Sequence, residues 1–400
     1  MDSFKSQLNQ RLAALREQNL FRELRRVDSP QSPRIKIDGK TFLNFSSNDY
    51  LGLANHPALK EAATKAIEKF GAGAGASRLI CGSLAPFHEL EEKLAAFKKT
   101  EAALTFSTGC AAALGTICAL LGKNDIIIID KLVHACIVDA ARLSGAKLRI
   151  FDHNDLEDLK KILKWSARQR TTESQVLVVT ESIFSMDGDA APLREIVTLK
   201  EKYGAWLMVD EAHATGLYGK NRRGCVEELG VSGQIEIQMG TLGKALGASG
   251  GYICGSRVLI AFLVNRARSF IFSTAPVPAA AAAATAGIHL AQSSEGDGRR
   301  KTLWQLIKQL NSKLSAASKQ SKDVKIRNSK PAGAIIPLIV GDETKAVELA
   351  SRLRSQNIFI PAIRYPTVAR GQARLRVTLT AAHSAKDVAE LLAALKTLDA

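Results

Sequence analysis

The chain of 400 residues is 46% hydrophobic, has a mean hydropathy near zero and carries a formal net charge of +16 at pH 7. This composition excludes a mainly disordered chain and predicts a globular protein of about two domains with a sizeable core. Apolar runs such as 126–129 and 279–284 are too short to cross a bilayer, so no membrane-spanning segment is expected. The first residues lack the apolar core of a secretion signal, which predicts a cytoplasmic protein.

The positive charge is scattered along the chain with few aromatic residues interleaved, so no nucleic-acid-binding function is expected. Two interpretations of the charge stay open: attraction of a polyanionic small molecule, such as a nucleotide-bearing thioester, or a basic surface that aids solubility. The six cysteines have neither zinc-site spacing nor the density of a disulfide framework. Free and mostly buried thiols are therefore expected, and no metal site is predicted.

The N-terminal third combines helices with loops. Leucines at helical spacing predict a helix over residues 1 to about 30, and alternation around Asp38-Gly39 predicts a hairpin over 34–45. A polar turn follows at 46–53. Helices are predicted at 57–70 and 88–99. The glycine-rich loop 71–78 between them fits either a ligand contact or a surface connector.

Beyond residue 100, short apolar runs alternate with helical stretches, which is typical of a parallel sheet with crossover helices. The runs lie at 126–130, 175–181, 205–211 and 235–241. Because ligands bind outside the carboxyl ends of such strands, the polar residues that follow should converge on one crevice. These residues are Asp130, His134, Glu181, Ser185, Asp210, His213, Thr241 and Lys244.

The remaining chain predicts a small α+β domain. Strands are expected at 334–340, 358–360 and 374–379, with helices at 345–355 and from Ala385 onward. The expected division has three parts: an N-terminal helix and hairpin segment at 1–55, a large cofactor-binding domain at 56–288 and a small C-terminal domain at 289–400.

Lys244 lies among glycines in the segment 241–252, where backbone can approach a ligand closely; the alternative is a solvated loop lysine. Pyridoxal phosphate needs such a lysine, a carboxylate for its ring nitrogen, an anion site for its phosphate and a flat group over its ring. Asp210 offers the carboxylate, and the turn at Gly109 before an alanine-rich helix offers the anion site. Asp210 could instead cap a helix, and His134 and His213 could be interfacial histidines.

Five motifs in order resemble the α-oxoamine synthases, which are pyridoxal-phosphate enzymes. The motifs lie at 44–53 (NFSSNDYLGL), 185–189 (SMDGD), 209–216 (VDEAHATG), 241–244 (TLGK) and 373–380 (ARLRVTLT). The resemblance runs from about residue 20 to the C-terminus. It implies an α/β protein of pyridoxal-phosphate fold type I (aspartate-aminotransferase-like), with a large, mostly parallel sheet domain and a small α+β C-terminal domain.

The resemblance assigns the catalytic roles to Lys244, which forms the imine with the cofactor, Asp210, which pairs with the ring nitrogen, and His134, which stacks on the ring. The further cofactor-binding positions are Gly109, Cys110, Ser185, His213, Thr241 and Thr274, and the substrate-binding positions are Arg22, Asn48, Arg364, Thr367 and Arg376. Arg364 matches the arginine that holds the substrate carboxylate. Thr274 matches a segment that reaches the neighbouring subunit's phosphate, which implies a homodimer.

Within the family, 44–50 and 184–193 are most similar to the branch that condenses L-alanine with a pimeloyl thioester, carried by coenzyme A or an acyl carrier protein, in biotin biosynthesis. Glycine C-acetyltransferase, another α-oxoamine synthase and a transaminase are the alternative enzymes, and a basic RNA- or partner-binding protein with an inactive site is the alternative outside catalysis. Cys110, Ala113, Val133 and Ala369 depart from the family pattern and bear on contacts around the site and on acyl-chain preference.

Overall fold

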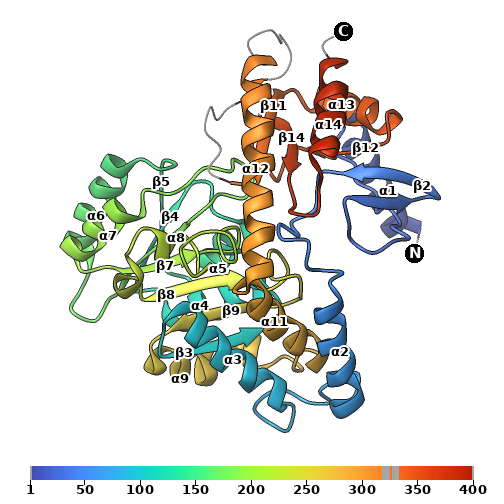
Figure 1. Cartoon of the computed structure of the whole chain (residues 1–400). Helices are drawn as coiled ribbons and strands as arrows, with labels where there is room; N and C mark the ends of the chain where they lie inside the picture. Colours follow the sequence, from blue (N-terminus) through green and yellow to red (C-terminus); the bar gives the residue numbers. More distant parts are fainter. Residues whose placement is uncertain (1, 318–324, 327–332, 399–400) are drawn as a thin grey trace. The chain divides into compact units, whose positions relative to one another are not determined.

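A computed structural model describes residues 2–317, 325–326 and 333–398 (Figure 1). The chain divides into two compact units. The small unit comprises Met1–Tyr50, Met186–Gly188 and Lys301–Ala400, and the large unit comprises Leu51–Ser185 and Asp189–Arg300. The small unit therefore joins the two ends of the chain, and the boundary near residue 300 falls inside helix α12 (Ser294–Ala317). The three-part division expected from the sequence stays a prediction.

A seven-stranded sheet forms the centre of the large unit, in the order β3-β9-β8-β7-β6-β4-β5. The strands are β3 (Ala102–Phe106), β4 (Ile126–Asp130), β5 (Lys147–Phe151), β6 (Val176–Glu181), β7 (Trp206–Asp210), β8 (Ile237–Thr241) and β9 (Gly251–Gly255). From β8 through β5 neighbouring strands are parallel, whereas β9 is antiparallel to both β3 and β8. The four predicted apolar runs are β4, β6, β7 and β8, so the mostly parallel sheet is confirmed.

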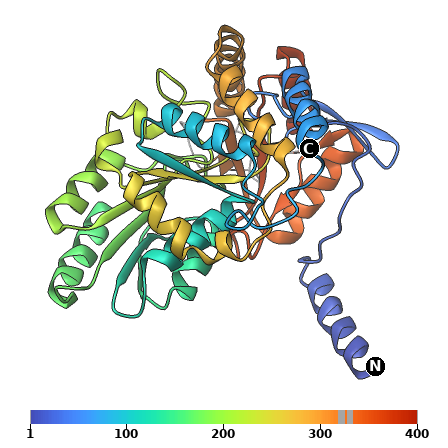
Figure 2. The same ribbon diagram turned by 90° about the horizontal axis from the view of Figure 1, so that it is seen from below.

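Helices cover both faces of this sheet (Figure 2), which is why every residue of β4 and β6 is buried. The helices are α2 (Pro57–Phe70), α3 (Ala85–Lys98), α4 (Gly109–Leu120), α5 (Ala135–Leu143), α6 (Leu156–Gln169), α7 (Leu193–Tyr203), α8 (Cys225–Glu228), α9 (Arg257–Arg266), α10 (Arg268–Ile271) and α11 (Pro278–Ala291), with a 3₁₀ turn at Ser232–Gln234. The predicted helix at 57–70 is confirmed, and the one predicted from His88 begins at Ala85.

The small unit contains two sheets. A three-stranded sheet has the order β1-β2-β12, from β1 (Arg34–Ile37), β2 (Lys40–Asn44) and β12 (Ile358–Phe359). A four-stranded sheet has the order β10-β11-β14-β13, from β10 (Lys325–Ile326), β11 (Ile335–Gly341), β14 (Ala373–Thr378) and β13 (Ala362–Ile363). Helix α13 (Glu343–Ser355) packs on β11 and β14, and α14 (Ala385–Lys396) is the last helix. The predicted hairpin is confirmed, and Asp38 and Gly39 both have the positive φ that its tight turn requires.

The N-terminal helix is shorter than predicted, because α1 covers only Asp2–Glu17. Asn19 has φ +55°, and the N–H of Leu20 donates to the carbonyl of Leu15 over 2.8 Å, which ends the helix. Leu20 is buried and Leu24 is fully exposed, so the leucines do not share one helical face as expected. The helical spacing of leucines continues past the turn that ends α1, which is why the predicted helix was too long.

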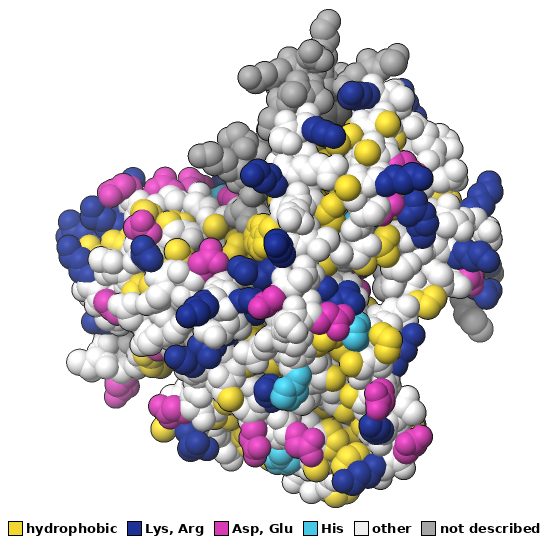
Figure 3. Space-filling view, in the orientation of Figure 1, with side chains coloured by type: hydrophobic (Ala, Val, Ile, Leu, Met, Phe, Trp, Pro, Cys, Tyr) yellow, Lys and Arg dark blue, Asp and Glu magenta, His cyan; other side chains and the backbone are white. Residues whose placement is uncertain are grey.

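The remaining expectations concern membrane spans, metal ligands, cysteines and surface charge. None of the described helices combines the length and apolar character needed to span a membrane, and the described part of the chain holds no cluster of three or more potential metal ligands. All six cysteines are free; Cys136, Cys225 and Cys254 are buried, whereas Cys81 and Cys110 are exposed. On the face drawn in Figure 3, lysines and arginines are interspersed with acidic side chains.

Candidate active site

Four strands of the large unit end in polar residues at one edge of the sheet. Glu181 ends β6, Asp210 ends β7 and Thr241 ends β8, while Asp130 ends β4. The parallel register places Glu181 directly opposite Asp210 and Asp210 opposite Met239. The convergence predicted from the strand ends therefore exists within the large unit.

Lys244 lies in a tight turn after β8. The N–H of Gly247 donates to the Lys244 carbonyl over 2.9 Å, and the N–H of Ala248 donates to the carbonyl of Leu242 over 2.9 Å. Gly247 has φ +67°, and a Cβ there would lie 2.6 Å from the carbonyl carbon of Leu53, so the turn requires glycine. The half-buried Lys244 places its Nζ 2.9 Å from Nε2 of His213. This fixed amine differs from a solvated loop lysine.

Asp210 is a buried acceptor close to this amine, with 5% of its surface exposed. Its Oδ1 accepts the N–H of Ala212 over 2.8 Å, and residues 211–224 form turns, so Asp210 caps no helix. Burial raises the pKa of Asp210, while Lys244 and the Ala212 N–H favour its charged form. A buried carboxylate of this kind suits a cationic ring nitrogen.

The turn before α4 provides an anion site. Thr108 caps the helix by accepting the N–H of Ala111 over 3.0 Å, and the first N–H groups of a helix have no partner within it. A Cβ on Gly251 would lie 2.6 Å from the backbone nitrogen of Gly109, so β9 approaches this turn closely. Gly109 and the exposed Cys110 thus stand at a helix N-terminus beside the end of β8, a position suited to binding an anion.

His134 presents a neutral, flat ring. Its Nδ1 accepts the N–H of Cys136 over 3.2 Å and lies 3.0 Å from the Cys136 sulfur. Burial raises the pKa of the Cys136 thiol, so the thiol keeps its proton. Partial burial of the ring, followed by Lys244, lowers the pKa of His134, although Asp210 acts in the opposite direction. A neutral imidazole with Nδ1 fixed as acceptor is suited to stacking on an aromatic ring.

The other expected cofactor contacts lie in the same unit. Ser185 is buried in the segment after β6, and Thr241 donates from its hydroxyl to the Gly250 carbonyl over 3.1 Å. Thr274 is exposed and forms an isolated bridge with Ser77, next to the glycine-rich loop 71–78. The roles of these side chains stay predictions.

The expected substrate-binding residues belong to the small unit, where they form two groups. Both terminal nitrogens of Arg376 donate to Oδ1 of Asn48, over 3.1 and 3.2 Å. In the second group Arg22 donates to the carbonyl of Tyr365 over 2.8 Å, and the Thr367 N–H donates to the carbonyl of Arg364 over 3.0 Å.

Arg364 is held by backbone carbonyls of the small unit. Its terminal nitrogens donate to the carbonyls of Asn19 and Phe21, while its buried Nε has no hydrogen-bond partner among the described residues. Burial, followed by Arg22, lowers the pKa of Arg364. A guanidinium fixed by backbone carbonyls is suited to an anionic partner.

Sequence reasoning assigned no role to His153. Its Nδ1 lies 2.9 Å from Oδ1 of Asp130, and its Nε2 lies 2.8 Å from Oδ2 of Asp189. Burial of His153 lowers its pKa, but the hydrogen bonds that its ring donates to these two carboxylates outweigh burial and raise the pKa to about 9. The imidazolium therefore joins the end of β4 to the segment that carries Ser185. Nothing in the spacing of the sequence points to this bridge.

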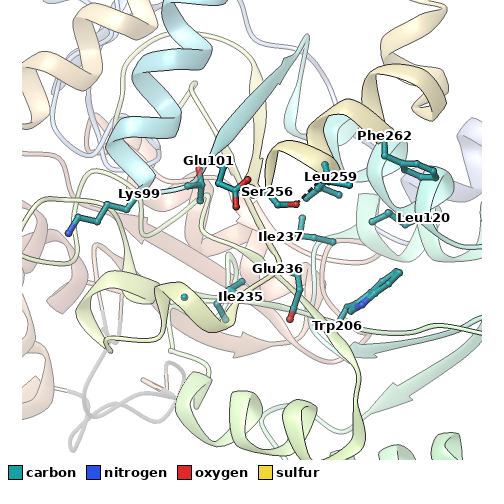
Figure 4. A pocket seen from close by; sticks show the side chains of 14 residues that line it. Lys99, Glu101, Leu120, Trp206, Ile235, Glu236, Ile237, Ser256, Leu259 and Phe262 are labelled. Atoms are coloured by element: carbon teal, nitrogen blue, oxygen red, sulfur yellow. Dashed lines mark hydrogen bonds between the residues drawn. The ribbon is translucent and has the colours of Figure 1, made fainter.

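A cavity of about 590 Å³ lies at the opposite edge of the same sheet (Figure 4). Its lining includes Trp206 and Ile237, the first residues of β7 and β8, together with the apolar side chains of Leu259 and Phe262. None of the expected site residues lines it. Lys244 and Asp210 therefore lie at the carboxyl edge, away from this cavity.

Comparisons with known proteins agree with this geometry. The family model for aminotransferase class I and II matches residues 40–395. The chain is 45% identical over 381 residues to the 8-amino-7-oxononanoate synthase of Thermoanaerobacter pseudethanolicus, covering 95% of this chain and 93% of that protein.

Two solved structures extend the comparison. A serine palmitoyltransferase from S. paucimobilis, with bound PLP–myriocin aldimine, matches with a TM-score of 0.91 at 29% identity, over 99% of this chain and 97% of that chain. An 8-amino-7-oxononanoate synthase from Francisella tularensis matches with a TM-score of 0.74 at 28% identity, over 89% and 97%. The expected fold type I is confirmed, and the chain belongs to the class I and II aminotransferase family, within which it is a member of the 8-amino-7-oxononanoate synthase family.

Proposed function

We propose that the chain catalyses the pyridoxal-phosphate-dependent condensation of L-alanine with a pimeloyl thioester, with loss of carbon dioxide, to give 8-amino-7-oxononanoate for biotin biosynthesis. The observation that carries the proposal is the fixed amine of Lys244 beside His213 at the carboxyl edge of the sheet, in a chain 45% identical to an enzyme of that name. The wild-type chain is expected to bind pyridoxal phosphate and to release thiol from the acyl thioester only when alanine is present.

The residues of the large unit fit this cofactor. The Gly109 turn would hold the phosphate, Asp210 the ring nitrogen and the neutral ring of His134 one face, with Lys244 as the attachment point. When bound, pyridoxal phosphate supplies an electron sink for the charge that develops on the amino acid Cα. The Nζ of Lys244 removes and returns the Cα proton, and His213, 2.9 Å away, holds this amine in place.

The small unit supplies the groups for an anionic substrate. Arg364 would bind the amino acid carboxylate and so orient the Cα–H bond. Arg22 and Thr367 adjoin Arg364, and Arg376 with Asn48 forms the second polar group. All five residues are proposed substrate contacts.

One assay distinguishes the alternatives. Purified protein receives alanine, glycine or serine with thioesters of graded length, carried by coenzyme A or by an acyl carrier protein, and thiol release is measured. Preference for glycine with an acetyl thioester would replace the proposed activity with that of glycine C-acetyltransferase. Amino transfer to a keto acid without thiol release would indicate a transaminase.

The cofactor test uses Lys244→Ala. Wild-type protein is expected to show the visible absorbance of lysine-linked pyridoxal phosphate, and the variant is expected to lose it together with thiol release. A wild-type protein that binds no pyridoxal phosphate would overturn the proposed function.

We further propose a cytoplasmic homodimer in which Thr274 of one subunit contacts the phosphate site of the other. Support comes from the exposed position of Thr274 beside the glycine-rich loop. Mixing Lys244→Ala with Thr274→Val subunits should restore activity beyond either parent if sites are shared. A monomer in sedimentation at working concentration would contradict the shared site.

A further inference from the structure

Glu181 is a buried acid at the carboxyl edge of the sheet, and the proposed function gives it no role. It is the last residue of β6, 2% of its surface is exposed, and its Oε1 has no hydrogen-bond partner within the described residues. The parallel register pairs it with Asp210, the last residue of β7. Paired residues of parallel strands point to the same side of a sheet, so the two carboxyl groups are neighbours.

Two neighbouring buried carboxyl groups do not both ionise readily, because each charge opposes the other and burial opposes both. The surroundings favour Asp210 as the ionised member. It accepts the Ala212 N–H over 2.8 Å, and Lys244 and Lys98 each favour its charge. Burial, followed by the charge of Asp210, raises the pKa of Glu181 well above its usual range. Lys244 and the backbone N–H groups of His134 and Ser185 act in the opposite direction and are outweighed.

We propose that Glu181 is a positioning residue that stays a neutral carboxylic acid beside Asp210, so that the ends of β6 and β7 present one negative charge to one cationic ring nitrogen. The inference rests on the proposed function only in naming that nitrogen as the partner of Asp210. A neutral acid fills the space next to Asp210 with polar atoms and adds no second charge. The balance of charge at the ring nitrogen then depends on Asp210 alone.

The first experiment compares Glu181→Gln with Glu181→Ala and with Asp210→Asn. Apoprotein is titrated with pyridoxal phosphate and binding is followed by visible absorbance, without alanine or thioester. A neutral amide of the same shape should keep the dissociation constant within about threefold of wild type, whereas Glu181→Ala and Asp210→Asn should each weaken binding about tenfold or more. The pH at which the bound cofactor's absorbance changes should likewise stay close to the wild-type value in Glu181→Gln and should shift in Glu181→Ala and Asp210→Asn.

The second experiment detects the proton itself. At pH 8 the infrared spectrum of wild-type protein should contain the carbonyl band of a protonated carboxylic acid, with and without cofactor, and Glu181→Gln should remove it. Asp210→Asn should keep the band but lower the pH at which it disappears, because the neighbouring charge is gone. Absence of this band in wild-type protein, or equal loss of cofactor binding in Glu181→Gln and Asp210→Asn, would overturn the proposal.

These results are separate from the test of the overall function. The infrared band requires no substrate and no cofactor, so it decides the state of Glu181 even if thiol release is never observed. Thermal unfolding of each variant distinguishes a local loss of cofactor binding from a general loss of folding.

Discussion

The Nζ of Lys244 and the Nε2 of His213 lie 2.9 Å apart, which joins the turn after β8 to the turns after β7. His213 is buried, and its ring restricts where the amine can go. Replacing it with alanine should reduce the rate of the proton-transfer step about 10- to 100-fold while cofactor still binds. Steady-state rates and the cofactor absorbance measure the two effects. The exposed His289 of α11 provides the control, since His289→Ala should leave both unchanged.

The close approach of β9 to the phosphate turn predicts a severe effect for Gly251→Ala. The added methyl group would lie 2.5 Å from the carbonyl oxygen of Thr108 and 2.6 Å from Gly109, so the start of α4 must move. We expect a loss of about 1–3 kcal/mol in unfolding free energy and weaker cofactor binding. Gly233→Ala is the matched control, because nothing lies within 4 Å of a Cβ at that position. Equal cofactor affinity in the two variants would contradict the proposal that the Gly109 turn binds the phosphate.

Arg364→Lys tests the proposed carboxylate site. A lysine cannot reproduce the two donations to the carbonyls of Asn19 and Phe21, so its charge would not be held in the same place. The KM for the amino acid should rise about 10- to 100-fold, with a much smaller change in the KM for the thioester. Arg26→Lys, at a highly exposed surface pair, should change neither KM. If Arg364→Lys raised only the KM for the thioester, Arg364 would be assigned to the acyl site instead of the carboxylate site.

The bridge of His153 between Asp130 and Asp189 predicts a pH-dependent contribution to stability. The pKa of His153 is raised to about 9 in the folded protein, above the 6.5 of an unperturbed histidine. The contribution is therefore fully present below pH 6.5 and is lost as pH rises through about 9. Chemical unfolding of wild type and His153→Gln should differ by about 1–3 kcal/mol at pH 6 and converge near pH 10. A constant difference across this range would rule out the charged bridge.

Much of the large unit could be predicted because its central strands are buried on both faces and read as continuous apolar runs, as at Ile126–Asp130. Strand β5 was missed because Lys147 and Arg149 lie at an edge and interrupt the apolar pattern. Strand β9 was missed because its glycines, Gly251 and Gly255, resemble a continuation of the turn around Lys244. Short edge strands with charges or glycine carry little periodicity.

The position of the candidate site could be predicted from the sequence, whereas its individual side-chain contacts could not. Lys244, Asp210 and His134 follow apolar strands, so the rule for carboxyl ends places them together. The neutral ring of His134 depends on its burial, and the bridge at His153 depends on Asp189, which is far away in sequence. Such contacts require the register of neighbouring strands and the side of the sheet that each side chain occupies, which spacing does not contain.

The antiparallel strand β9 also has a consequence for how the chain folds. It is the neighbour of β3 in the finished sheet, although helices α4 to α8 and all the parallel strands come between them in sequence. During synthesis β3 stays unpaired until residues 251–255 have been made and can pair with it. A contact between segments so far apart in sequence forms slowly. The Gly109 turn, held against Gly251, is completed only at that step. A truncated or stalled chain that ends before β9 would therefore expose an unpaired strand, with aggregation as its expected fate.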